Sequence, residues 1–381
     1  MKLTGFSIRR PPHESGQART LEWIAGAHAE AHAKVASLDA TQRTEFAERI
    51  RRALGRYGCG PTKIRARGHV VPDVGSTDWD RAVLYDVRRN PHGRGSEARS
   101  LFFDDSVSAY FEAEYEGATP PSEIIHVTCT GYLSPSGAQK LVAKKDWGTT
   151  TRVTHAYHMG CYAAFPAIRL AAGSLLLPRP LGNDTAPRVD IVHTELCSLH
   201  FDPSDHSVEQ LVVQTLFADG YIRYAAVPDG RGPGLQVLAL DERVLPGSAG
   251  AMKWIVSDWG MRMTLARSVP EKIATSVRGV VTDVYRRAGL SWAEQLKRSV
   301  FAVHPGGPKI IDRVREVLEL DEAQVQTSRA VLADHGNMSS ATLPYIWARI
   351  AADPSVAPGT LICSLAFGPG LTICGGLFRK Q

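Results

Sequence analysis

The chain has 381 residues, of which 44% are hydrophobic and 22% are charged, and its formal net charge is +5. This composition is that of a globular protein, and the length exceeds what one core usually holds, so we expect two halves or domains. The positive charge is mild and forms no basic stripe of the kind that binds nucleic acid, but it suits an anionic substrate or an acidic carrier protein.

Neither a targeting segment nor a disulfide framework is evident in the sequence. Residues 1–16 lack the apolar core of a signal peptide, and no later run reaches the roughly 18 apolar residues that span a membrane. The cysteines are spread without close spacing, which indicates reduced thiols in a cytoplasm. They are Cys59, Cys129, Cys161, Cys197, Cys363 and Cys374.

Strands and helices alternate along the first part of the chain. Residues 20–55 predict helix, because threonine and aspartate precede acidic first-turn residues and glycine follows the basic end. A polar loop is expected at 178–187. Short β-branched runs predict strands at 122–131, 149–160 and 188–201.

The second part repeats this rhythm. Residues 270–290 and 307–320 have the apolar spacing of amphipathic helices. Residues 298–307 predict a strand that enters a glycine-rich turn, and 359–370 and 371–379 predict a closing strand pair. The alternation favours a layered α/β fold with mixed sheets.

Cys161 lies directly after a glycine, in HMGCYAAFPAIRLAAG. A lone cysteine is most often a small buried apolar residue. Here, however, Pro166 is tolerated only in the first turn of a helix, so a helix should begin near Tyr162 to Phe165. Cys161 would then lie at a helix amino terminus, where the free amides and the helix dipole lower a thiol pKa.

Two residues are candidate partners of this thiol. His304 lies in FAVHPGGPKIID, and Asn337 lies in DHGNMSSATLPYIW. Each follows an apolar element and precedes a turn of glycines or small residues, where α/β folds present functional side chains. Taken singly, the histidine would be a turn residue and the asparagine a helix cap.

The motifs MGC, TELCS, QTLFADG, HPGGPKII, GNMSSAT and FGPGLT occur in this order over residues 50–381. Together they resemble the chalcone-synthase-like type III polyketide synthases. The HPGGP and GNMSSA forms distinguish the chain from the β-ketoacyl carrier-protein synthases that initiate fatty-acid synthesis and share the same fold.

The resemblance implies a thiolase fold and a homodimer. Two pseudo-equivalent αβαβα halves in five layers would span residues 1–225 and 226–381. The first half would carry Cys161 as nucleophile, and the second would carry His304 and Asn337. In such an acyltransferase the cysteine thiolate forms an ion pair with the histidine and takes up the acyl group of a thioester. The enzyme then condenses this acyl group with a decarboxylated malonyl unit to give a short polyketide.

The resemblance also implies a set of cavity residues. Phe217 corresponds to a gate phenylalanine, although an ordinary core aromatic is the alternative, and Met263 replaces a second gate phenylalanine. Trp254 stands where chalcone synthases have a small residue at the cavity floor, and His200 replaces a small hydroxylated residue. Both changes should reduce or reshape the cavity, which argues against a chalcone-type product.

Two further groups follow from the resemblance. Phe367 and Gly368, in FGPG, would shape the cavity backbone, since glycine allows close approach. Lys63, Arg65 and Arg67 correspond to a basic cluster for coenzyme A phosphates, although a solvated loop is the alternative. The donor would be a thioester of coenzyme A or of an acyl carrier protein, with no metal and no organic redox cofactor.

Three other interpretations compete with this one. A zinc site could in principle use His193, Cys197, His200 and His206. However, His193 and His200 would lie on opposite faces of a strand, and no paired-cysteine motif occurs. A papain-like hydrolase also uses Cys, His and Asn, but the local signature of that family is missing. A non-elongating acyltransferase, or a ketosynthase that joins two acyl chains, would keep the triad, and a narrowed cavity mildly favours it.

Overall fold

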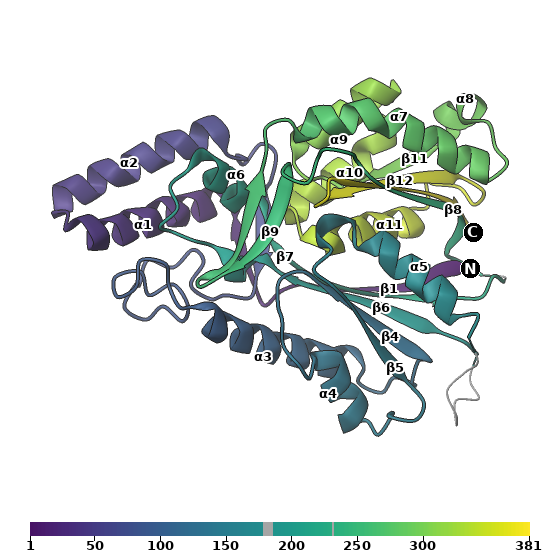
Figure 1. The fold of residues 1–381 in the computed structure, drawn as a ribbon, viewed down its shortest axis with the longest axis horizontal. Helices are drawn as coiled ribbons and strands as arrows, with labels where there is room; N and C mark the ends of the chain where they lie inside the picture. Colours follow the sequence, from purple (N-terminus) through teal and green to yellow (C-terminus); the bar gives the residue numbers. More distant parts are fainter. Residues whose placement is uncertain (178–185, 231) are drawn as a thin grey trace.

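The computed structural model describes residues 1–177, 186–230 and 232–381, so the loop expected at 178–187 lies largely outside the described residues. Nine described strands form one mixed sheet (Figure 1). In spatial order they are β11 (Val300–Val303), β12 (Leu361–Gly368), β13 (Thr372–Lys380), β8 (Leu235–Val244), β1 (Lys2–Arg9), β7 (Asp219–Val227), β6 (Val189–Leu196), β4 (Glu123–Thr128) and β5 (Arg152–Tyr157).

The sheet has two parts that meet at its amino-terminal strand. β4 runs parallel to β5 and β6, β11 runs parallel to β12, and the other pairings are antiparallel. β1 pairs along its length with β7, but it pairs with β8 only through Lys2 with Gln236 and Leu3 with Leu235. The short second contact lets the two parts diverge, and Figure 1 shows helices between them.

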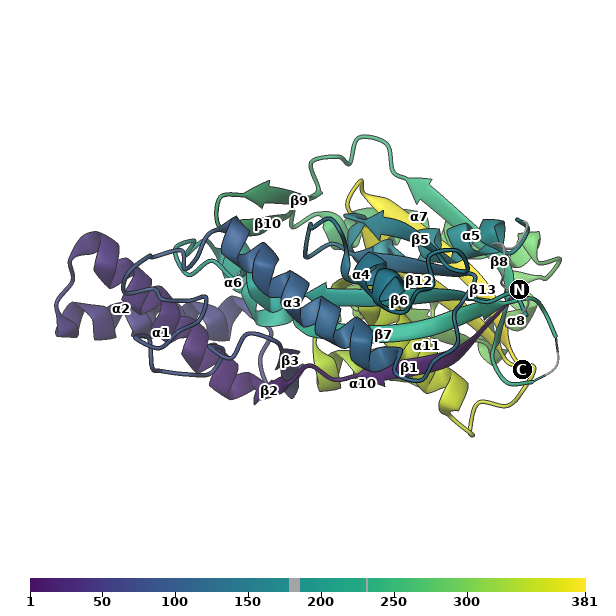
Figure 2. The same ribbon diagram turned by 90° about the horizontal axis from the view of Figure 1, so that it is seen from below.

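Helices cover both outer faces and fill the middle. α3 (Ser96–Glu114) and α4 (Gly137–Lys144) lie outside the first part of the sheet, and α7 (Val269–Arg287) and α9 (Pro308–Leu318) lie outside the second (Figures 1 and 2). The middle layer holds α5 (Ala164–Ser174) and α11 (Thr342–Ala352), while α10 (Glu322–His335) packs beside β11. This αβαβα layering confirms the predicted fold class.

Three hydrophobic clusters correspond to the spaces between layers. The middle cluster includes Phe165 of α5 and Trp347 of α11, both buried. The amino-terminal turns of both helices are buried between the two parts of the sheet, whereas Arg169 of α5 is exposed and pairs with Glu242.

The remaining elements form the margin of the molecule. α1 and α2 form an antiparallel pair that projects away from the sheet (Figure 2). The expected helix over 20–55 is split there, because Ser37 adopts a left-handed conformation and Asp39 caps the next helix by accepting from the Gln42 N–H at 2.9 Å. The marginal elements are α1 (Gln17–Ala36), α2 (Ala40–Tyr57), β2 (His13–Gly16), β3 (Ala66–His69), α6 (Val208–Leu216), β9 (Met252–Ser257), β10 (Gly260–Leu265) and α8 (Trp292–Gln295).

The other expected strands and helices lie close to their predicted positions. The proposed boundary between residues 225 and 226 falls inside β7, two residues before the strand ends, and the division into halves stays a prediction. Among the described helices, none combines the length and the apolar character needed to cross a membrane.

Arg99 ties α3 to the segment that follows β6. Its buried guanidinium donates to the carbonyls of Leu199 (2.7 Å), Phe201 (3.0 Å), Arg94 (2.7 Å) and His92 (2.6 Å). Hydrogen bonds from a charged donor are strong, and buried carbonyls are costly to leave unpaired. Arg99 therefore positions the backbone on either side of His200.

We expect Arg99→Leu to lower the free energy of unfolding by about 3–5 kcal/mol, because four carbonyl acceptors would lose their donor. Urea unfolding followed by circular dichroism measures this change. Arg81→Leu is the matched control, since Arg81 is 89% exposed and only 3.7 Å from Asp78 in a surface pair, and it should shift stability by less than about 0.5 kcal/mol. Equal effects of the two changes would contradict the role assigned to Arg99.

Candidate active site

Cys161 lies where β5 passes into the middle layer. It belongs to a single 3₁₀ turn, Gly160–Tyr162, directly before α5. Gly160 has φ of 75°, and a Cβ there would lie 2.8 Å from Pro369 Cδ, so both the conformation and the space require glycine. The predicted helix start near 162–165 is confirmed, because α5 begins at Ala164 with Pro166 in its first turn.

The two candidate partners come from other elements of the same region. His304 directly follows β11, and its N–H donates to the Leu365 carbonyl of β12 at 2.8 Å. Asn337 lies between α10 and a 3₁₀ turn, and its Oδ1 accepts from the Ser339 N–H at 2.9 Å. The turn with Cys161 packs against β12 and against the turn with Ser339, and the Asn337 side chain acts on the Cys161 thiol.

Hydrogen-bonding side chains surround the sulfur. Cys161 Sγ lies 3.8 Å from Ser339 Oγ, and the same hydroxyl oxygen lies 3.1 Å from Cys129 Sγ. Hydrogen bonds from Ser339 and Asn337 lower the pKa of Cys161, but burial outweighs them and raises it to about 12. This differs from the expected lowering by the helix terminus, because the side chain is only 5% exposed and a thiolate there loses its hydration.

His304 is completely buried, and burial lowers its pKa to about 3. Neither ring nitrogen has a hydrogen-bond partner among the described residues. At neutral pH the resting site therefore holds a neutral thiol and a neutral imidazole. The imidazole keeps one N–H to donate and one lone pair to accept a proton.

A second buried acid adjoins the thiol. Glu195 Oε2 accepts from the Cys129 N–H at 3.0 Å and from Thr130 Oγ1 at 3.1 Å, while Oε1 accepts from the hydroxyl and the N–H of Ser340. Burial raises the pKa of Glu195, and its charge in turn raises that of Cys161. Glu195 lies in the motif TELCS and Ser339 in GNMSSA, but the sequence does not indicate that they and Cys129 meet, because no spacing rule links them.

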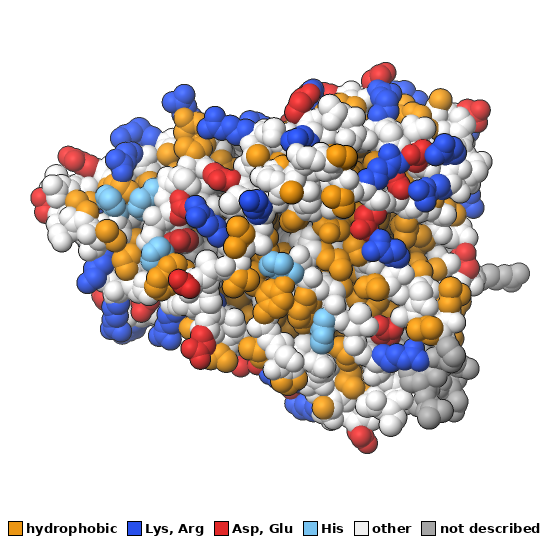
Figure 3. Space-filling view, in the orientation of Figure 1, with side chains coloured by type: hydrophobic (Ala, Val, Ile, Leu, Met, Phe, Trp, Pro, Cys, Tyr) orange, Lys and Arg blue, Asp and Glu red, His pale blue; other side chains and the backbone are white. Residues whose placement is uncertain are grey.

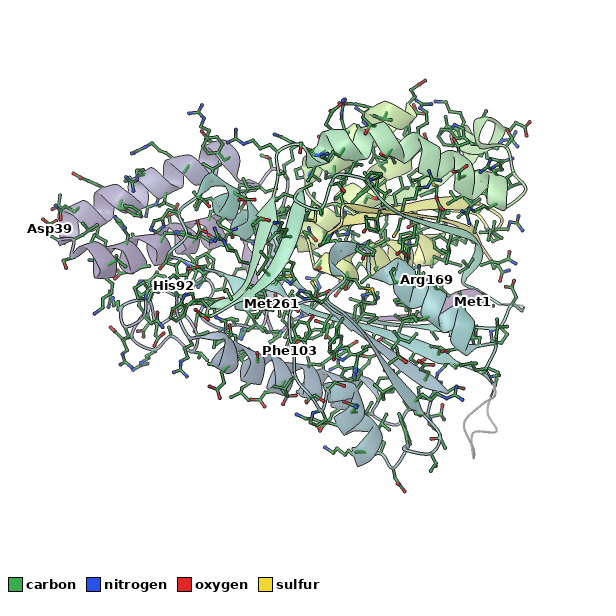
Figure 4. All side chains as sticks on the ribbon, viewed as in Figure 1. Met1, Asp39, His92, Phe103, Arg169 and Met261 are labelled. Atoms are coloured by element: carbon green, nitrogen blue, oxygen red, sulfur yellow. The ribbon has the colours of Figure 1, made fainter. Side chains whose placement is uncertain are left out.

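Phe217, Met263, Trp254 and His200 line one cavity of about 70 Å³. It lies between α1, β3, α6 and the β9–β10 hairpin, and Met261, labelled in Figure 4, is part of its wall. Phe217 also pairs through its backbone with Asn337, and the Ala218 N–H donates to the Asn337 carbonyl at 2.8 Å. We call this cavity the side chamber; the structure brings four predicted cavity residues together there, next to Asn337.

Trp254 and His200 line the side chamber next to the loop of Cys129 and Thr130. Trp254 Nε1 donates to the Cys129 carbonyl at 2.6 Å, and His200 Nε2 lies 2.8 Å from the Thr130 carbonyl. Their rings meet edge to face with centroids 5.5 Å apart. The indole and the imidazole thus occupy space beside the loop that carries Cys129.

Phe367 and Gly368 end β12 beside the nucleophile. Phe367 is buried, and a Cβ on Gly368 would lie 2.5 Å from Tyr162 Cδ1. The close approach of β12 to the residue after Cys161 therefore needs glycine at this position.

The three basic residues assigned to coenzyme A separate in space. Lys63 and Arg65 are exposed, and Arg65 pairs with Asp334. Arg67 is buried, and its guanidinium donates to Gln17 Oε1 and to the carbonyls of Gln214 and Phe217. Arg67 lines the side chamber from within, so it does not share the surface position of the other two.

The histidines that suggested a zinc site have protein partners. His193 lies 2.9 Å from Ser340 Oγ and 3.2 Å from the Tyr224 hydroxyl, and His206 lies 2.7 Å from His28. Across residues 1–177, 186–230 and 232–381, no three potential ligands converge on a metal position.

Comparison with known families identifies the second part of the chain. Residues 236–380 match the family described as chalcone and stilbene synthases, C-terminal domain. This region holds His304, Asn337 and the FGPG segment.

Solved structures extend the similarity to the whole chain, and each comparison covers 100% of it and 99% of the other. The C-terminal type III polyketide synthase domain of Steely1 from Dictyostelium has a TM-score of 0.81 at 23% identity. The 1,3,6,8-tetrahydroxynaphthalene synthase of Streptomyces coelicolor gives 0.76 at 23%, and PKS-I of the brown alga Ectocarpus siliculosus gives 0.78 at 20%. The resemblance inferred from the motifs is confirmed: the chain has the fold of type III polyketide synthases, and residues 236–380 match the chalcone and stilbene synthase C-terminal domain.

Proposed function

We propose that this protein is a type III polyketide synthase-like ketosynthase, an acyltransferase that loads an acyl group on Cys161 and extends it with a malonyl-derived unit. The observation that carries the proposal is His304, a fully buried imidazole whose two ring nitrogens have no partner among the described residues. Leaving such groups unpaired costs about 1–3 kcal/mol. Substrate atoms that pair with them recover this cost at the reacting centre.

The first step makes the acyl-enzyme. The neutral imidazole of His304 takes the Cys161 proton as the sulfur attacks the donor thioester carbonyl. A new carbon–sulfur bond forms, the donor carbon–sulfur bond breaks, and the leaving thiol receives the proton from the imidazolium. Because both groups rest in their neutral forms, the proton moves with the attack rather than before it.

The second step makes the carbon–carbon bond. Loss of carbon dioxide from a malonyl thioester leaves an electron pair as an enolate, and N–H donors of His304 and Asn337 stabilise its oxygen. The enolate carbon attacks the acyl-Cys161 carbonyl, and the Cys161 carbon–sulfur bond breaks. This chemistry needs no metal and no redox cofactor.

The alternative of a non-elongating acyltransferase, or of a ketosynthase that joins two acyl chains, is not favoured by the family match over residues 236–380. The condensing chemistry also gives His304 and Asn337 a role, as donors to the enolate oxygen.

The proposal extends to the assembly and its setting. β5 ends the sheet and has an open edge, and hydrophobic side chains gather near the centre of the face in Figure 3. Open strand edges pair readily with a second copy, which supports a homodimer. The free cysteines of the described chain suit a cytoplasm. Light scattering of the purified protein checks the dimer, and a monomer at micromolar concentration would contradict it.

Incubation with acyl-coenzyme A donors should leave one acyl group on the wild-type protein and none on Cys161→Ala, because the other thiols lack the His304 and Asn337 pair. Intact mass spectrometry measures the adduct. Cys197→Ala is the matched control, since Cys197 is also a thiol near Glu195 and its pKa is likewise raised. An adduct that survives Cys161→Ala would refute the assignment of the nucleophile.

The pH dependence of the free thiol should follow its burial. An exposed thiol titrates near pH 8.5, so its alkylation by iodoacetamide levels off above about pH 9. The pKa of Cys161 is raised to about 12, so the thiolate fraction, and with it the alkylation rate, should keep rising about tenfold per pH unit through this range. Peptide mapping follows Cys161 alone, and a plateau near neutral pH would show that it rests as a thiolate.

Lys63 and Arg65 are proposed to attract coenzyme A phosphates at the surface. Lys63→Gln combined with Arg65→Gln should raise KM for coenzyme A thioesters and weaken its salt dependence while kcat changes little, because ground-state binding alone is lost. Lys34→Gln, also an exposed cation but on α1, serves as the control. Unchanged KM with coenzyme A donors would instead point to a carrier-protein donor.

Trp254 is proposed to limit chain length. Trp254→Gly should lengthen the products, because the indole and its contact with the Cys129 carbonyl fill the space beside the acyl chain. The change should cost less stability than the about 3–5 kcal/mol of a fully buried aromatic, because Trp254 is only partly buried. Liquid chromatography with mass spectrometry measures the products of the folded variant. An unaltered chain-length distribution would make Trp254 an ordinary packing residue.

A further inference from the structure

The side chamber contains two hydrogen-bond donors that nothing in the protein satisfies. Trp23 Nε1 and Arg67 Nη2 are buried and have no partner among the described residues, and both side chains line this one cavity. Trp23 is 4% exposed and Arg67 is 6% exposed. Buried polar groups are nearly always paired, so two orphan donors around one cavity call for a specific explanation.

The other polar side chains of the lining do have partners. Each makes at least one hydrogen bond within the protein. Trp23 Nε1 and Arg67 Nη2 are donors, so what the chamber lacks is a hydrogen-bond acceptor. They are Thr20 (to the Gly16 carbonyl, 3.2 Å), His69 (Ser15 Oγ, 2.9 Å), Ser198 (Asp219 Oδ2, 2.6 Å), His200 (Thr130 carbonyl, 2.8 Å), Gln210 (Met263 carbonyl, 2.5 Å) and Gln214 (Asp202 carbonyl, 2.8 Å).

Arg67 also lacks a counter-ion. Burial lowers its pKa to about 10, so it remains a cation at neutral pH. Three of its hydrogen bonds go to neutral oxygens, two of which are the Gln214 and Phe217 carbonyls at the carboxyl end of α6. No carboxylate of the described residues forms an ion pair with it; Asp219 instead accepts from Val70 and Ser198. A buried cation with no carboxylate at hydrogen-bond distance is costly, and the carbonyl dipoles and the nearby charge of Asp219 offset only part of that cost.

Water alone satisfies this site poorly. A buried water needs two to four polar partners, whereas apolar side chains, among them Ile24, Val74, Val213 and Met263, form much of the chamber lining. An elongated ligand with an aliphatic body and an oxygen-bearing end meets both requirements at once. A carboxylate offers acceptors for the two donors and the missing negative charge.

We propose that the side chamber binds the distal end of the acyl substrate and that Trp23 and Arg67 select an acyl thioester with a terminal carboxylate, a monothioester of a dicarboxylic acid. The inference rests on the proposed function, since the acyl group is the one attached to Cys161. Phe217 and Trp254 line the chamber, Phe217 pairs with Asn337, and Trp254 contacts Cys129, so the chamber adjoins the reacting centre.

The test compares acyl-coenzyme A donors that are matched in length and differ only at the far end. Glutaryl, adipyl and suberyl thioesters are set against valeryl, hexanoyl and octanoyl thioesters on the wild-type protein, and kcat/KM for acylation of Cys161 is followed by intact mass. At the best chain length we expect the carboxylate donor to be preferred by about 10- to 100-fold, the usual range for a charge-assisted hydrogen bond. Equal or better use of the alkyl donors would overturn the proposal.

A pair of variants assigns the preference to the chamber. Trp23→Phe removes the N–H and keeps most of the ring, so the carboxylate preference should fall several-fold. Trp79→Phe is the matched control, because Trp79 is also buried and stacks on Trp23 at 6.2 Å but does not line the chamber. A loss of preference in both variants, or in neither, would contradict the role of the Trp23 N–H.

An equilibrium measurement separates this inference from the proposed function. Isothermal titration of wild-type protein with free adipate and free hexanoate needs no reaction at Cys161. Tighter binding of adipate, weakened in Trp23→Phe, supports the chamber even if no donor acylates the protein, in which case the proposed function alone fails. Acylation without any carboxylate preference, together with equal binding of the two acids, retains the function and refutes the chamber proposal.

Discussion

Burial keeps water away from Cys161, His304 and Glu195, and this desolvation determines their protonation. Among the described residues, no lysine or arginine forms an ion pair with the Glu195 carboxyl group. Desolvation destabilises the charged form of each group, so each group favours its neutral form. A charged form is expected only when a bound substrate supplies atoms that stabilise it.

Neutral hydrogen bonds keep the site ordered in place of ion pairs. The Ser339 hydroxyl lies between the Cys129 and Cys161 thiols. The Glu195 carboxyl group accepts hydrogen bonds from the Cys129 N–H and from the Thr130 and Ser340 hydroxyls. These donors come from turns at the ends of strands and helices, where free backbone amides are available. Small displacements of those turns would change several hydrogen bonds together, which couples the packing of the layers to the protonation of the site.

The side chamber follows a different rule, because there a permanent charge is buried. Arg67 cannot become neutral at physiological pH, and the carboxyl end of α6 holds it in place. The reacting centre and the chamber thus differ in kind: one holds groups that change protonation, and the other holds a fixed cation. This contrast is what we would expect if, as proposed above, the acyl group reacts at Cys161 and its distal end binds in the chamber.

Local sequence determined much of this molecule. The start of α5 follows from Pro166, and the order of motifs around Cys161, His304 and Asn337 was sufficient to indicate the family fold. These features depend on residues within a few positions of one another, or on side chains that recur in a fixed order, so they can be inferred without coordinates.

Only the tertiary structure decided the environments. The prediction of a lowered thiol pKa did not anticipate that burial would outweigh the helix terminus at Cys161. Lys63, Arg65 and Arg67 look alike in sequence, yet Arg67 lines the chamber because its guanidinium donates to Gln17 of α1 and to carbonyls at the end of α6. The hydrogen-bond partners of Glu195 lie 65 to 145 residues away along the chain. Desolvation and long-range contact are properties of the packed chain, and no local pattern encodes them.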